Sequence, residues 1–222
     1  MKSIAIVGAG PGLGLSIAKT FGKNGFQVAL IARRKESLDR LVATLQSYDI
    51  EAKGFIADVR DEQSIITAFS AIKAQFGSVD VLEYSPISME FIPPSQVTTE
   101  IAKKTFEFQV LGAIASVQQV LPDMIKNHDG AILLTGGRSA IVPMSLIGSL
   151  SPMVAALRNY AYILNEELKD KGIYAGTVTI CRMSEDVDSI AALHWDMYQK
   201  RNRVEEIFGE NIRIENGFPV RF

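Results

Sequence analysis

The sequence predicts one α/β domain built on a doubly wound parallel β-sheet of about seven strands, with helices on both faces. Short apolar runs alternate along the 222 residues with longer stretches in which apolar residues recur every three or four positions. No linker, repeat or low-complexity segment interrupts this alternation, so residues 1–222 are expected to form a single domain. Strands joined repeatedly by helices run parallel, and a ligand is then expected beyond their carboxyl ends.

The strands are predicted at the short apolar runs. The first run, IAIV, is rich in β-branched residues and has no polar position, as expected of a strand buried on both faces. The predicted strands are Ile4–Val7, Val28–Ala32, Phe55–Ala57, Val79–Tyr84, Ala131–Thr135, Tyr174–Ile180 and a short terminal strand at Ile212–Ile214.

The helices are predicted from apolar residues that share one face. The first three faces consist of Leu13, Ile17, Ala18 and Phe21; Leu38, Leu41, Val42 and Leu45; and Ile65, Ile66, Phe69 and Ile72. Gly25 gives the first helix a stop signal. A long helical stretch is expected from Val97 to about Asn127, where Pro122 should bend or end it. Pro152–Lys171 has proline in its first turn, and a last helix turns the following residues inward: Ile190, Leu193, Met197, Val204 and Ile207.

Composition excludes several classes of protein. The net charge is −2 and no basic stripe occurs, so nucleic acid is not an expected partner. A single cysteine, Cys181, fits a reducing cytoplasm, and with two separated histidines it provides no metal-ligand spacing. The opening MKSIAIVGAG is too short for a signal peptide, and no apolar run approaches transmembrane length. A cytoplasmic protein without a membrane partner is therefore expected.

A glycine-rich segment, GAGPGLG, follows the first predicted strand and opens the first helix. Glycine allows a sharp turn and a close approach of the backbone to a pyrophosphate, whose charge then lies at the helix N-terminus. The strand–turn–helix context favours a dinucleotide site over a turn without a ligand. The residues assigned to this turn are Gly8, Gly10, Pro11, Gly12, Leu13 and Gly14.

The spacing of Gly8, Gly12 and Gly14 resembles that of short-chain dehydrogenases/reductases, and the resemblance extends along most of the chain. It implies a Rossmann-like fold and further cofactor-binding positions after the second, third and fourth strands: Arg33 and Arg34, Asp58 and Val59, and Ser85 and Pro86. Two guanidinium groups after the second strand suit the extra phosphate of NADP, where NAD-preferring members carry an acidic residue. A helix cap is a competing role for the Asp58 region, although Asp61 can also cap.

The resemblance fails at the positions where the family carries its catalytic groups. The family's Asn-Asn-Ala-Gly is Tyr84-Ser85-Pro86-Ile87 here, and Gln109 stands where the family has asparagine. The catalytic serine corresponds to Gly137, the tyrosine thirteen residues later to Leu150, and the lysine four residues further on to Val154. None of the six tyrosines is followed by lysine at the fourth position. The chain therefore resembles a divergent member without the Ser-Tyr-Lys residues.

This loss matters because the nicotinamide transfers a hydride while the protein must move the accompanying proton. Other polar groups are candidates for that task, although packing, loop or turn roles are favoured for each: Tyr84, Ser85, Arg138, Ser139 and His194. Residues 181–210 are expected to form a helical segment near the substrate pocket.

Three functions remain open. The favoured one is an NADP(H)-binding protein, with or without a second small-molecule ligand, that lacks the standard mechanism. The second is an active oxidoreductase on a carbonyl or hydroxyl compound with an unusual acid such as Tyr84. The third is a structural partner in an assembly with a vestigial cofactor site. A homodimer or homotetramer is expected, because the helix from Pro152 has more apolar surface than one core-facing stripe uses.

Overall fold

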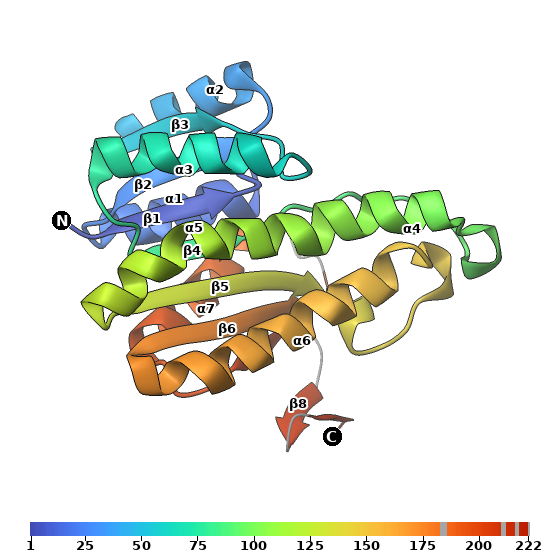
Figure 1. Ribbon diagram of the computed structural model, residues 1–222. Helices are drawn as coiled ribbons and strands as arrows, with labels where there is room; N and C mark the ends of the chain where they lie inside the picture. The colour runs from blue at the N-terminus through green and yellow to red at the C-terminus, as the bar shows by residue number, and fades with distance from the viewer. Residues whose placement is uncertain (183–185, 210–211, 216–217, 222) are drawn as a thin grey trace.

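The computed structural model describes residues 1–182, 186–209, 212–215 and 218–221, and Figure 1 shows how their helices and strands are arranged. A seven-stranded sheet crosses the molecule with the strand order β3-β2-β1-β4-β5-β6-β7, and every neighbouring pair in it is parallel. The strands are β1 Ser3–Val7, β2 Gln27–Ala32, β3 Ala52–Ile56, β4 Val81–Tyr84, β5 Gly130–Gly137, β6 Ile173–Ile180 and β7 Glu205–Phe208. The predicted doubly wound parallel sheet is confirmed.

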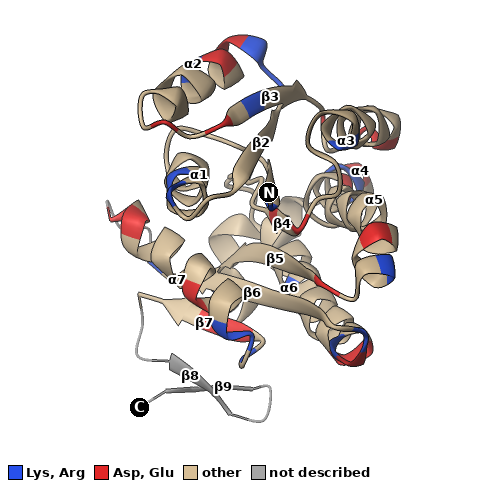
Figure 2. Ribbon diagram, turned by 90° about the vertical axis from the view of Figure 1, so that its left-hand side faces the viewer, with Lys and Arg blue, Asp and Glu red and all other residues tan. Residues whose placement is uncertain are grey.

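Helices cover both faces of this sheet, as Figure 2 shows in a view along it. One face carries α1 Leu13–Lys23, α2 Lys35–Gln46 and α7 Val187–Lys200, and the other carries α3 Glu62–Phe76, α5 Gly112–Asn127 and α6 Leu150–Leu168. Each face has its own apolar cluster, because strand side chains alternate between the two. On β4, for example, Val81 packs toward α1 and α7, whereas Leu82 packs toward α3 and α5.

The strand order reverses between β1 and β4. From β1 the chain moves outward to β2 and β3, and it then returns to place β4 on the other side of β1. Val7 lies opposite Ile31 of β2 and Tyr84 of β4, so the carboxyl ends of the three strands are level. Helices leave in opposite directions at such a point, and a crevice opens between them.

The C-terminal part differs from the prediction. The last helix was expected to include Val204 and Ile207, but α7 ends at Lys200 and Arg201 follows with a left-handed φ of 47°. Ile207 belongs to β7, which is the seventh strand of the main sheet. The predicted strand at Ile212–Ile214 exists as β8 Ile212–Glu215, but it pairs antiparallel with β9 Phe218–Arg221 in a separate two-stranded sheet.

The long stretch before β5 is also more irregular than predicted. It consists of α4 Thr99–Phe106, a π-helical turn Glu107–Leu111 and then α5. Pro122 does not end α5, which continues to Asn127. Pro122 and Gln118, whose carbonyl group loses its helical partner, are both exposed, so water can satisfy that carbonyl.

A buried ion pair attaches β7 to the body of the domain. The Glu205 carboxylate accepts from the Arg158 guanidinium of α6 (Nη2–Oε2, 2.5 Å), the Tyr162 hydroxyl (2.7 Å) and the Thr179 hydroxyl of β6 (2.6 Å). The Glu205 side chain is 1% exposed and that of Arg158 is 15% exposed. A buried charge in this position requires such a full set of partners.

Candidate functional site

The glycine turn between β1 and α1 lies at the point where the strand order reverses. Gly8 has a φ of +88°, and the backbone N–H groups of Gly8 and Ala9 both donate to the Ile31 carbonyl oxygen (3.0 Å each). A β-carbon on Gly8 would lie 2.7 Å from the Pro86 nitrogen, and one on Gly14 would lie 3.1 Å from the Ala9 α-carbon. Packing therefore requires these two glycines.

The other two glycines leave the outer surface of the turn open. A β-carbon on Gly12 would meet nothing within 4 Å, and one on Gly10 would meet only the Gly8 carbonyl at 4.0 Å. Gly12 also precedes α1 without a side-chain cap, and the first turn of α1 has no acidic residue. The first N–H groups of α1 are thus accessible to an anion.

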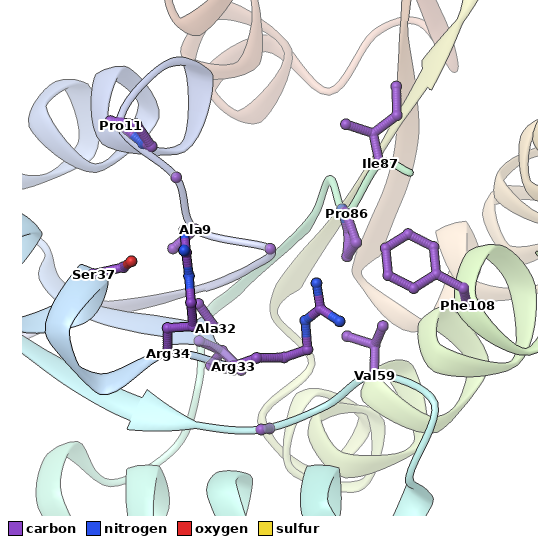
Figure 3. Close-up of a pocket in the computed structure, with 14 residues that line it drawn as sticks. Ala9, Pro11, Ala32, Arg33, Arg34, Ser37, Val59, Pro86, Ile87 and Phe108 are labelled. Carbon is purple, nitrogen blue, oxygen red and sulfur yellow. The ribbon is translucent and has the colours of Figure 1, made fainter. Parts of the chain in front are cut away.

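A cavity of about 210 Å³ lies against this turn (Figure 3). Of the residues predicted for cofactor binding, it brings together Gly8, Gly10, Pro11, Arg33, Arg34, Val59 and Pro86. Gly12, Leu13, Gly14, Asp58 and Ser85 were also predicted but do not line it. Other residues line the cavity but were not predicted, among them Ser37, Ile87 and Phe108. Their side chains come from α2, the loop after β4 and the π-helical turn, and no local sequence pattern distinguishes them.

The two arginines after β2 are the charged groups of this cavity. Figure 3 shows the guanidinium group of Arg33 among Val59, Pro86 and Phe108, while Arg34 extends toward Ala9 in the glycine turn. Both side chains belong to exposed residues, and neither forms a salt bridge within the described part of the chain. Two positive charges without a salt bridge thus lie beside an open glycine turn, with Asp58 near enough to Arg33 to interact electrostatically. Such a pair of charges attracts anions.

The Asp58 side chain is held by hydrogen bonds from Arg60 and does not line the cavity. Its carboxylate accepts from Arg60 Nη2 (2.6 Å) and Nε (3.1 Å), and these hydrogen bonds hold its pKa below the usual range. Asp61 caps α3 by accepting from the Gln63 and Ser64 N–H groups (3.0 and 3.3 Å). The alternative role weighed for this region is therefore carried by Asp61.

The positions aligned with the family's serine, tyrosine and lysine have no polar side chain. Gly137 ends β5, and Leu150 and Val154 are each 3% exposed in the first turns of α6. Leu150 and Val154 pack with Ile147 in a small apolar cluster that Ala140 and Met144 complete. Leu150 also lines a second cavity, of about 360 Å³, whose wall includes Arg33, Ile87 and Phe108 of the first.

Tyr84 and Gln109 are buried residues that line neither cavity. Tyr84 is fully buried and donates to the Phe108 carbonyl oxygen (2.6 Å), and burial raises the pKa of its hydroxyl. It is the packed aromatic that was weighed against an acid role, because it lines neither cavity. Gln109, in the π-helical turn, is 2% exposed, and its Oε1 is the one buried side-chain oxygen or nitrogen without a partner among the described residues.

The described residues of the segment 181–210 pack mainly on the far side of the sheet from α6. Its helix α7 packs on α1, where Trp195 makes an edge contact with Phe21 at 5.1 Å between ring centroids. The described residues of 181–210, like Arg138 and Ser139, line neither cavity. The placement of this segment near a substrate pocket stays a prediction, whereas the expected core role of Trp195 and Tyr198 is confirmed by their packing.

The buried carboxyl group of Glu83 was not among the predicted site residues. Glu83 of β4 is fully buried; its Oε1 is 2.8 Å from the Thr135 hydroxyl of β5, and that hydroxyl is 2.9 Å from His194 Nε2 of α7. The Ser85 hydroxyl donates to Glu83 Oε2 (2.9 Å). Burial raises the pKa of Glu83 to about 8 and lowers that of His194 to about 4. The available signal was a lone carboxylate within an apolar strand, where charged residues are rare unless they are paired.

Two further properties follow from the described residues. They contain no cluster of three His, Cys, Asp or Glu side chains that could hold a metal ion. Each helix among them is too short or too polar to cross a membrane.

Comparison with known proteins agrees with this architecture. Residues 2–188 match the family described as short chain dehydrogenase. The chain is 26% identical over 211 residues to oxidoreductase asL5 of Sarocladium schorii, a match that covers 93% of this chain and 82% of the relative. It is 23% identical over 221 residues to 2,3-dihydro-2,3-dihydroxybenzoate dehydrogenase of Bacillus subtilis, covering 99% and 82%.

Solved structures show the same fold. A short-chain dehydrogenase from Rhodopseudomonas palustris superimposes with a TM-score of 0.86 at 23% identity, covering 94% of this chain and 98% of that one. A metagenomic short-chain oxidoreductase in complex with NADP has a TM-score of 0.86 at 19% identity, covering 93% and 96%. With the parallel sheet, the glycine turn after β1 and a family match over most of its length, the chain belongs to the short-chain dehydrogenase/reductase family.

Proposed function

We propose that this chain binds NADP(H) in the cavity beside the glycine turn and does not use the Ser-Tyr-Lys proton transfer of its family. The observation that carries the first half is the pair Arg33 and Arg34, which line the cavity and form no salt bridge among the described residues, while the nearby Asp58 carboxylate pairs with Arg60. NADP differs from NAD by a phosphate on the adenosine ribose, and two adjacent guanidinium groups suit that phosphate. Relatives of this fold have been solved with NADP or NADPH, among them the L-sorbose reductase of Gluconobacter frateurii.

The residues proposed to hold the cofactor fall into groups, each of which would contact a different part of the cofactor. The turn from Gly8 to Gly14, with Gly10, Pro11, Gly12 and Leu13, would hold the pyrophosphate at the start of α1. Arg33 and Arg34 would bind the ribose phosphate, and Val59 and Pro86, which line the cavity, would form the wall beyond it; Asp58 and Ser85 precede these two residues in the sequence. The bound nicotinamide supplies or accepts a hydride.

The second half of the proposal rests on the apolar cluster at the start of α6. A carbonyl oxygen that gains negative charge needs a nearby donor, and Leu150 and Val154 offer none. Positioned acid–base catalysis contributes roughly 10²- to 10⁴-fold in rate, and the apolar cluster at the start of α6 has no group that could provide it. The rival acid Tyr84 is buried and lines neither cavity, and its hydroxyl is bonded to a carbonyl group. We therefore favour binding without the standard mechanism over an active oxidoreductase that uses Tyr84.

The test is a fluorescence titration with NADPH and NADH. A charge-assisted hydrogen bond contributes about 1.5–3 kcal/mol, so the arginines should favour NADPH by roughly 10- to 100-fold. Arg33→Asp should remove or reverse this preference. Arg40→Asp is the matched control, because Arg40 is an exposed α2 residue outside the cavity and the substitution changes the charge equally. Equal affinities of the unmodified protein for the two cofactors would contradict the assignment.

A further inference from the structure

A chain of polar side chains lies buried between the sheet and α7. It runs from Ser85 to Glu83 on β4, then to Thr135 on β5 and to His194 on α7, and it ends where His194 Nδ1 lies 2.8 Å from the Ile190 carbonyl oxygen. Glu83 and His194 are 0% exposed and Thr135 is 8% exposed. We call Glu83, Thr135 and His194 the buried relay.

Counting hydrogens shows which protonation states the relay accepts. Nδ1 must carry a hydrogen, because a carbonyl oxygen can only accept. The Thr135 hydroxyl lies between Glu83 Oε1 and His194 Nε2 and has a single hydrogen to donate. With one shared proton, every hydrogen donor in the relay has an acceptor. The relay then consists either of neutral Glu83 with neutral His194 or of the Glu83 carboxylate with the His194 imidazolium. With no shared proton two acceptors compete for one hydrogen, and with two shared protons the Thr135 hydrogen has no acceptor.

The relay therefore holds one proton over a broad pH range, and Glu83 loses that proton only at alkaline pH. The raised pKa of Glu83, about 8, and the lowered pKa of His194, about 4, agree with this counting. Burial is the main cause of both shifts, and the hydrogen bonds from Thr135 and Ser85 oppose the first.

Among the described residues, Glu83 hydrogen-bonds to the uncharged side chains of Ser85 and Thr135 and forms no salt bridge. On α1, the buried Ser16 is hydrogen-bonded to Asp188 at the start of α7. From β1 the neighbours are apolar, Ile4 and Ile6. On α7 the group that faces Glu83 through Thr135 is His194 itself.

The relay lies on the side of the cofactor site opposite the arginines. The glycine turn follows β1, and Arg33 and Arg34 follow β2 on one side of it. A dinucleotide held by its pyrophosphate at the turn, with its adenosine phosphate at the arginines, extends its other half over β4 and β5. Glu83 and Thr135 are near the carboxyl ends of those two strands, and Ser85 connects Glu83 to Pro86 in the cavity wall.

We propose that Glu83, through the buried relay, makes the choice between NADP⁺ and NADPH depend on pH. This inference rests on the proposed binding of NADP(H). NADP⁺ has a positively charged nicotinamide ring and NADPH a neutral one, so only NADP⁺ favours the carboxylate form of Glu83. Binding of NADP⁺ then releases the Glu83 proton to solvent, and alkaline conditions strengthen NADP⁺ binding relative to NADPH.

The experiment measures Kd for both cofactors by calorimetry from about pH 6 to about pH 9.5, a range that brackets the ionisation of the carboxyl group. The ratio of the two Kd values is the readout, because titration of the ribose phosphate is common to both ligands and cancels. The ratio should change in favour of NADP⁺ by on the order of tenfold, the size expected of one interaction between unit charges at an effective dielectric constant of about 20.

Two variants separate Glu83 from other carboxylates. Glu83→Gln retains a hydrogen-bonding side chain of the same shape and should give a ratio that does not vary with pH. Glu90→Gln is the control, because Glu90 is an exposed carboxylate on the loop after β4 and its loss should leave the pH dependence intact.

Proton release gives the same test without substitution. Calorimetry of the unmodified protein near pH 8, in two buffers of different ionisation enthalpy, should show proton release with NADP⁺ that NADPH does not produce. A constant ratio, or equal proton release with both cofactors, would overturn the inference while leaving NADP(H) binding intact. Failure to bind either cofactor would instead overturn the proposed function and this inference together.

Discussion

The buried relay should also set how the stability of the protein depends on pH. Glu83 has a folded-state pKa of about 8 against a model value of 4.5, so between these values the folded protein retains a proton that the unfolded chain loses. Its stabilising contribution is present below pH 4.5 and is lost as the pH rises toward 8. His194 has the opposite sign, with a folded-state pKa of about 4 against 6.5, so its contribution is present above pH 6.5 and is lost as the pH falls toward 4.

The magnitude follows from these windows. One proton contributes a slope of about 1.4 kcal/mol per pH unit. Between pH 4.5 and 6.5 the two slopes oppose each other and stability should be nearly constant. From pH 6.5 to 8 only the Glu83 slope remains, so the free energy of unfolding should fall by about 2 kcal/mol. The shifted Asp groups titrate near or below pH 3.8 and Tyr84 above pH 10.0, outside this window.

Urea denaturation of the apoprotein at a series of pH values measures this profile. Glu83→Gln removes the alkaline slope and leaves that of His194, so the variant should gain stability up to about pH 6.5 and remain constant above it. A flat profile of the unmodified protein between pH 6.5 and 8 would refute the reasoning, as would a variant that keeps the alkaline fall.

Three more outcomes follow from the site. The unmodified protein should bind NADPH without measurable oxidation of it by simple ketones or aldehydes, and Gly137→Ser, Leu150→Tyr and Val154→Lys should introduce turnover only in combination, because such residues act as a unit; brisk turnover of the unmodified protein would contradict this. Gly8→Ala should lower stability by about 1–3 kcal/mol and abolish NADPH binding, whereas Gly25→Ala, which shares the positive φ but has nothing within 4 Å, should cost stability alone; thermal melts and titration distinguish the two. Light scattering at micromolar concentration should give the mass of a dimer or tetramer through the exposed apolar surface of α6, and a strictly monomeric mass would count against that prediction.

The sequence predicted β1, β2, β5 and β6 because most of their residues are apolar and buried, as strands covered on both faces require. It also predicted the glycine turn, since strand, turn and helix are adjacent in the chain. Features that depend on distant contacts were missed. The end of α7 is one example, because Ile207 fits a helical spacing equally well and only pairing with Thr179 of β6 makes it part of a strand.

Some residues of the site could not be predicted from the sequence for the same reason. Glu83 belongs to a strand predicted as apolar, and the other members of the relay, Thr135 and His194, lie more than 50 residues away from it on β5 and α7. Phe108 lines the cavity from the π-helical turn, and no local pattern predicts that turn. Positions that the chain brings together only by folding therefore required the structure.

Because Glu205 of β7 pairs with Arg158 of α6, the folding of the rest of the domain depends on the last strand of the main sheet. A chain truncated before Glu205 would leave the Arg158 guanidinium largely enclosed without its carboxylate, together with the hydroxyl groups of Tyr162 and Thr179. It would also uncover the hydrogen-bonding edge of β6, which β7 protects along Thr177–Ile180. Open edges of this kind template association between chains, so shortened forms of this protein should accumulate as aggregates instead of as smaller folded domains.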